Sequence, residues 1–134
     1  MPLCIDLKPF ERLIINGASI RNGDRRSSFV FETHCRFLRE TEIIYESEAD
    51  TPCKKLWLTL QVLHLSEQPK EIEGQFYSQA IQLIRMMPSA APYLAEINLA
   101  LEENHTHKAL KAAKRLVQHE REKCENAQGQ SNAA

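Results

Sequence analysis

The chain has 134 residues, of which 43% are hydrophobic and 26% are charged, and its formal net charge is −1. These values are ordinary for a soluble globular protein, and the length fits one domain or a small β module fused to a helical one. A net charge so close to zero excludes nucleic-acid binding through the field of the whole molecule, so any such binding must use local charge. No apolar run approaches the roughly 20 residues that a membrane span needs, so we expect no membrane partner.

The first 40 residues predict short antiparallel strands. Leu3, Ile5 and Leu7 alternate with polar positions, which is typical of a half-buried strand. The pairs Asn16-Gly17 and Asn22-Gly23 each predict a type I′ hairpin turn, because both central residues of that turn need positive φ. A further strand is predicted around Phe37, so about residues 2–39 should form a small antiparallel β-meander or roll. Three aromatic residues could stack on unpaired bases, but their strand faces predict core packing instead: Phe29, Phe31 and Phe37.

The rest of the chain predicts helices. The acidic segment 40–50 should be a solvated connector with a short helical piece around Ile43, Ile44 and Tyr45. Thr51-Pro52 then gives an N-cap and a proline in the first turn. Apolar spacing and prolines predict helices that run to about residue 67, over 71–87, over 92–103, and from a cap at Thr106 to about Cys124. We therefore expect an α+β fold with a β module over 1–45, a helical module of about four helices over 46–126 and a disordered tail over 127–134.

The sequence offers few candidates for disulfide, metal-binding or catalytic residues. The four cysteines are far apart in the sequence, and with no export signal ahead of them we expect free buried thiols in a reducing compartment, the cytoplasm. His105 and His107 do not have the i, i+4 spacing of helical metal ligands. No nucleophile motif, phosphate-binding glycine loop or carboxylate pair is present. We expect no enzyme, no metal and no cofactor.

Arginine is concentrated near the predicted turns. Residues 1–40 hold seven basic residues against five acidic ones, and six of the seven are arginine. Guanidinium groups on an exposed turn can bridge phosphates and stack on unpaired bases. On the residues alone, plain solvated side chains are the better interpretation. The last helix carries a second basic face that predicts a secondary contact at most, at Lys108, Lys111 and Arg115, because Glu120 and Glu122 dilute its charge.

The N-terminal string also resembles a known family. Ile15-Asn16-Gly17-Ala18 followed by Arg21-Asn22-Gly23-Asp24-Arg25-Arg26, with Phe37-Leu38-Arg39-Glu40 and Thr51-Pro52 beyond, is similar to the FlbT family of bacterial flagellar regulators. The likeness runs from the first residue through the helix after Pro52. It departs at Phe10, where the family tends to have glycine. Because phenylalanine resists positive φ, we expect a type I turn after Lys8-Pro9.

The resemblance implies a post-transcriptional repressor of flagellin synthesis that associates with the 5′ untranslated region of flagellin mRNA and promotes its degradation. It shifts the interpretation of the arginine-bearing turns to RNA contact, by Arg12, Arg21, Asn22, Arg25 and Arg26. The segment from Phe37 to Ile43 is similar to the end of the carbon storage regulator family, which implies a further RNA contact by Arg39.

A second function class stays open. The helices could form a protein-binding adaptor for flagellin, a flagellar chaperone or another flagellar regulatory protein, by holding an amphipathic helix. The two activities could coexist, one in each module. The sequence leaves open the RNA site, the choice between monomer and homodimer, and the sign of the effect on flagellin expression.

Overall fold

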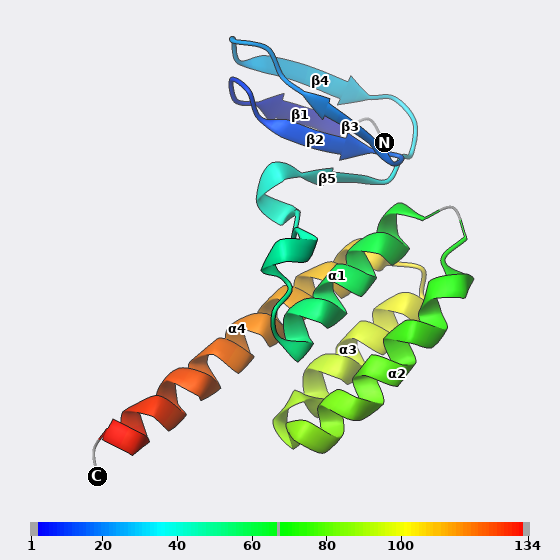
Figure 1. The fold of residues 1–134 in the computed structure, drawn as a ribbon. Coiled ribbons are helices and arrows are strands. Elements are labelled where there is room, and N and C mark those ends of the chain that lie inside the picture. Colours follow the sequence, from blue (N-terminus) through cyan, green and yellow to red (C-terminus); the bar gives the residue numbers. More distant parts are fainter. Residues whose placement is uncertain (1–2, 67, 133–134) are drawn as a thin grey trace. The chain divides into compact units, whose positions relative to one another are not determined.

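The computed structural model describes residues 3–66 and 68–132, with side chains described as far as Glu125. The fold is α+β, as predicted, with strands first and helices after them (Figure 1). The chain forms two compact units. The β unit runs to Ile43 and includes the short segment that begins at Leu65, and the helical unit contains Ile44–His64 and the chain from Gln68 onward.

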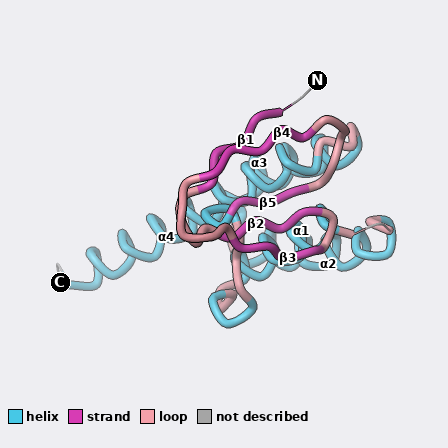
Figure 2. Tube along the Cα trace, turned by 90° about the horizontal axis from the view of Figure 1, so that it is seen from above, coloured by secondary structure: helices cyan, strands magenta, loops and turns pink. Residues whose placement is uncertain are grey.

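Five short strands build the β unit: β1 Leu3–Leu7, β2 Arg12–Ile15, β3 Ala18–Arg21, β4 Ser27–Phe31 and β5 Phe37–Arg39. They form two antiparallel sheets, one with the order β1-β4 and one with the order β3-β2-β5 (Figure 2). Among the strands of the described residues, only β2 and β3 are neighbours both in the sequence and in a sheet. The remaining pairs join strands that are distant in the sequence, so the β unit is closer to a roll than to a meander.

The two Asn-Gly pairs adopt different conformations. Asn16 and Gly17 have φ values of 48° and 85° and connect Ile15 directly to Ala18 across the β2–β3 pair, as a type I′ turn requires. Neither Asn22 nor Gly23 has positive φ. The hairpin predicted at the second pair is therefore wrong, because β3 and β4 belong to different sheets and the loop between them crosses from one sheet to the other.

The core of the β unit lies between its two sheets. Ile5, Leu7 and Leu13 are buried, and partly buried residues pack against them, namely Ile15, Phe31 and Phe37. The Phe31 and Phe37 rings lie 5.2 Å apart between centroids. Core packing was thus correctly predicted for these two rings but not for Phe29, which is 44% exposed. Phe29 pairs with Ile5 in a sheet of only two strands, which leaves part of its own face uncovered.

The acidic connector is more ordered than predicted. It contains two 3-10 helices, Glu40–Glu42 and Glu46–Glu48, with Ile43 and Ile44 between them in buried positions. Ile43 has extended backbone angles rather than helical ones. In the helical unit, the buried Gln61 side chain accepts a hydrogen bond from the Ile44 N–H at 2.8 Å and donates one to its carbonyl at 2.9 Å. This pairing satisfies both backbone polar groups of Ile44, a buried residue that lies outside any helix or strand.

Four α-helices form the helical unit: α1 Pro52–Leu65, α2 Lys70–Met86, α3 Ala91–Glu102 and α4 Thr106–Asn132, with a 3-10 turn over Pro88–Ala90. Their apolar faces meet in a core that includes Leu56, Leu60, Leu63, Phe76, Leu83, Ile97 and Leu116. α4 continues beyond the end expected near Cys124. The tail expected over 127–134 falls on the last turns of α4 and on residues 133 and 134, which lie outside the described residues.

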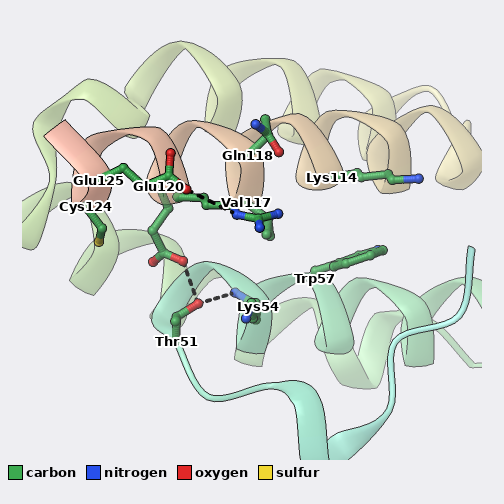
Figure 3. A pocket seen from close by; sticks show the side chains of 10 residues that line it. Thr51, Lys54, Trp57, Lys114, Val117, Gln118, Glu120, Cys124 and Glu125 are labelled. Atoms are coloured by element: carbon green, nitrogen blue, oxygen red, sulfur yellow. Dashed lines mark hydrogen bonds and ion pairs between the residues drawn. The ribbon is translucent and has the colours of Figure 1, made fainter.

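The N-terminus of α1 is hydrogen-bonded to a side chain of α4. Thr51 accepts a hydrogen bond from the Lys54 N–H at 3.2 Å, which confirms the predicted N-cap. Its hydroxyl donates to one Glu120 carboxylate oxygen at 2.5 Å (Figure 3). The other carboxylate oxygen accepts from the Cys53 N–H at 3.3 Å. A carboxylate at this position also complements the positive end of the helix dipole. Thr106, the other residue expected to cap a helix, is instead the first residue of α4, and its hydroxyl lies 2.6 Å from His64 Nδ1.

All four cysteines are free, but only Cys53 is buried. Cys4 and Cys124 are exposed and Cys35 is intermediate, so the expectation of buried thiols fails for the other three. Burial, together with the nearby Glu120 carboxylate, raises the pKa of the Cys53 thiol far above its ordinary value. Cys53 therefore remains a neutral thiol that packs as a small apolar side chain.

Candidate nucleic-acid interface

The turn that joins β1 to β2 has an unusual backbone. The Glu11 N–H donates to the Lys8 carbonyl at 3.1 Å, so Pro9 and Phe10 are the two central residues of the turn. Phe10 has a φ of +61°, in the left-handed region. The type I turn expected at this position is therefore wrong, because type I keeps φ negative and only type II takes positive φ at the second central residue. The geometry is enforced by two further bonds, Phe10 N–H to the Gly23 carbonyl and Lys8 N–H to the Glu11 carboxylate, each 2.9 Å long.

The side chain of Asn22 fastens the next loop to this turn. Its Nδ2 donates to the carbonyls of Leu7 at 3.2 Å, Lys8 at 2.9 Å and Arg25 at 2.8 Å. Its Oδ1 accepts from the Gly23 N–H. These bonds engage both polar atoms of the amide, so the structure gives Asn22 a role in shaping the loop. We refer to residues 22–26 as the arginine loop.

Three arginines extend from this framework without a side-chain partner among the described residues. Arg25 and Arg26 lie in the arginine loop, Arg21 ends β3, and all three are exposed. Arg21 is also opposite Arg12 in the β2–β3 register, so the two side chains leave the same face of the sheet. The hydrogen bonds of Asn22 hold the backbone of the arginine loop, and the exposed guanidinium groups that it carries are of a type that binds phosphates.

Arg39 is engaged differently. Its guanidinium donates to the Asp6 carbonyl at 2.6 Å and lies 3.6 Å from the Glu11 carboxylate. The hydrogen bond to Asp6 connects β5 with β1, and the ion pair with the largely buried Glu11 side chain connects β5 with the turn that precedes β2. The structure therefore places Arg39 within the framework of the site. Sequence reasoning could not find this role, because Asp6 is 33 residues away along the chain.

The basic face of α4 belongs to the helical unit. Lys108 and Lys111 are exposed, and Arg115 forms an ion pair with Glu96 of α3. Between α1 and α4 lies a groove with a volume of about 580 Å³, where Trp57 and Lys114 lie on opposite sides (Figure 3). Its lining carries both signs of charge, so it does not select an anion or a cation: Lys54, Lys114 and Arg121 against Glu120 and Glu125.

Two other kinds of feature are absent from the described residues. No group of three or more His, Cys, Asp or Glu side chains there is arranged to hold a metal ion. None of the helices in the described part of the chain has the length and apolar character to cross a membrane.

Comparison with known proteins identifies the family. Residues 3–123 match the family described as flagellar protein FlbT. The "Probable flagellum biosynthesis repressor protein FlbT" of Rhodopseudomonas palustris strain TIE-1 is 30% identical over 122 residues, which cover 91% of this chain and 97% of the relative. The "Flagellum biosynthesis repressor protein FlbT" of Caulobacter vibrioides is 30% identical over 129 residues, which cover 92% and 89%. No solved structure matches. The chain belongs to the FlbT family of flagellar proteins.

Proposed function

We propose that this chain is a cytoplasmic post-transcriptional repressor that binds the 5′ untranslated region of flagellin mRNA and promotes degradation of the message. The observation that carries the proposal is the arginine loop, in which Arg25 and Arg26 are exposed, have no side-chain partner among the described residues and stand on a hydrogen-bonded framework. Membership of a family whose relatives are named flagellum biosynthesis repressors supports a repressor role.

In this mechanism, the arginine loop binds phosphates of the leader while Arg12 and Arg21 hold a neighbouring phosphate across the β2–β3 pair. Bidentate guanidinium–phosphate contacts are stronger than neutral hydrogen bonds and fix the orientation of the strand. Bound protein would block initiation by the ribosome and leave the message open to cellular nucleases. The chain itself acts by occupancy and supplies no hydrolytic chemistry.

The decisive experiment compares two double variants by titration of a flagellin leader RNA at fixed salt. Arg25→Ala with Arg26→Ala should weaken binding by more than about 100-fold, because charge-assisted hydrogen bonds contribute about 1.5–3 kcal/mol each. Lys108→Ala with Lys111→Ala removes the same charge from exposed positions of α4 and should weaken binding much less. Both variants should unfold close to the wild type, since surface changes usually stay within about 0.5 kcal/mol each.

Two outcomes would contradict the proposal. If the α4 variant loses binding while the arginine-loop variant keeps it, the RNA contact belongs to the helical unit. If the wild type binds the leader with an affinity that does not fall as salt rises, phosphate contacts are not involved, because each neutralised phosphate releases counterions.

A second candidate function is supported by α2. Tyr77, Ile81 and Ile84 recur at the spacing of one helix face and are each more than 40% exposed. Such a face fits an amphipathic helix of flagellin or of a flagellar regulatory protein. Ile81→Ser with Ile84→Ser should abolish co-purification of that partner and leave the affinity for leader RNA unchanged. A homodimer through the same face would instead appear as a halving of the molar mass in light scattering for this variant.

A further inference from the structure

Phe10 combines two unfavourable features. A bulky residue with positive φ is a conformational outlier that persists only where the surroundings enforce it. Phe10 is also 57% exposed as a residue, so burial of the side chain does not compensate for the backbone strain. Glycine would occupy this turn position without either disadvantage. The features together point to a role for the exposed ring itself.

The ring stands on a rigid support next to the arginine loop. The Phe10 N–H is bonded to the Gly23 carbonyl, and the Asn22 amide joins Lys8 on one side to Arg25 on the other. The aromatic turn and the arginine loop are therefore held together by several backbone contacts. The positions around Phe10 are exposed and mostly charged, namely Lys8, Asp24, Arg25 and Arg26.

We infer that Phe10 is a stacking platform for an unpaired base of single-stranded RNA whose adjacent phosphates are bound by Arg25 and Arg26. This inference rests on the proposed RNA-binding function and adds a preference for single strands. Aromatic rings beside a basic surface are the usual means of holding single-stranded nucleic acid, because every base offers a π face. An apolar protein partner fits less well, since charged residues are depleted from the centre of protein interfaces.

The test uses the full chain and two RNA probes. The first is an unstructured single strand of about 12 nucleotides from the flagellin leader, a length within the usual range of single-strand sites. The second is the same segment in a blunt duplex. Phe10→Leu keeps the Cβ, the backbone strain and an apolar surface but removes the π face. It should bind the single strand about 5–150-fold more weakly, which corresponds to about 1–3 kcal/mol per stacked base. Its affinity for the duplex, where no base is free to stack, should stay at the wild-type value.

Two further variants separate stacking from a structural role. Phe10→Tyr restores a ring and should restore affinity for the single strand. Phe10→Gly removes the strain and the ring together, so its urea midpoint should be at or above that of Phe10→Leu while its RNA affinity stays low. A merely structural role would instead make affinity follow stability across the three variants.

The failure of this inference is distinguishable from failure of the proposed function. If Phe10→Leu binds the single strand like the wild type while Arg25→Ala with Arg26→Ala loses binding, stacking is refuted and the RNA function stands. Equal losses on both probes would also refute stacking, because the ring would then serve the fold of the loop. If the wild type binds neither probe, the proposed function itself fails.

Discussion

Replacing each of two glycines in turn with alanine tests how the β unit forms its turns. Gly17 has a φ of +85°, whereas Gly23 is not in the left-handed region, and a Cβ added at either position meets nothing within 4 Å. The two changes therefore differ in backbone strain and not in steric contact. An alanine forced into the left-handed region costs roughly 1–2 kcal/mol.

The comparison isolates that strain. Both substitutions remove the same freedom from the unfolded chain, which by itself stabilises by about 0.4–1 kcal/mol, and this contribution cancels between the variants. Gly23→Ala should therefore be more stable than Gly17→Ala by about 1–2 kcal/mol. With a urea dependence near 2 kcal/mol per molar, the two midpoints should differ by about 0.5–1 M.

The assay should follow the amide signals of β2 and β3 during urea titration, so that the transition measured is that of the β unit. Gly23→Ala should also keep its affinity for leader RNA, because the Gly23 carbonyl and N–H that hold the loop are retained. The reasoning would be refuted by a Gly23→Ala midpoint at or below that of Gly17→Ala. That result would mean that the second Asn-Gly pair carries the strained turn.

Three further predictions concern the helical unit. Glu120→Gln should lower the free energy of unfolding by about 1–2 kcal/mol in thermal denaturation, because the start of α1 loses a charge-assisted cap; an unchanged melting temperature would contradict this role. Above pH 9.0, the ordinary pKa of the Cys53 thiol, the free energy of unfolding should fall by up to about 1.4 kcal/mol per pH unit. The reason is that the thiol ionises in the unfolded chain but stays protonated in the folded one. Cys53→Ala should flatten this dependence on pH. Gln61→Leu should cost at least about 2 kcal/mol, because both backbone polar groups of Ile44 lose their partner, and a nearly neutral change would argue that water replaces it.

Local chemistry explains which turns could be predicted from the sequence. Asn16-Gly17 forms the expected turn because two residues tolerant of positive φ lie directly between paired strands. The same dipeptide at Asn22-Gly23 does not form this turn, because the side-chain amide of Asn22 donates hydrogen bonds to backbone carbonyls 14 and 15 residues earlier in the chain. Phe10 shows the opposite case, in which surrounding hydrogen bonds impose a backbone angle that the residue itself disfavours.

The candidate site was predictable in part for the same reason. The exposure of Arg21, Arg25 and Arg26 follows from their place on and beside a loop, as residue type and turn chemistry indicate. The internal bonds of Asn22 and Arg39 depend on strand pairing between distant segments, which no local pattern encodes. No sequence pattern identifies Phe10 as a site residue, because its exposure and its place beside the arginine loop depend on the fold.

The cap that Glu120 gives to α1 has a consequence for the order in which the chain assembles during synthesis. The strands of the β unit end at Arg39, so all of their pairing partners leave the ribosome early. The first turn of α1 begins at Pro52, yet the carboxylate that completes it comes from a residue 69 positions after Thr51. Closing so long a loop is entropically costly and precedes any reward from the contact. We therefore expect the two units to mature at different times, with a nascent chain that stops short of Glu120 carrying a nearly finished β unit and a helix α1 whose first turn is still open.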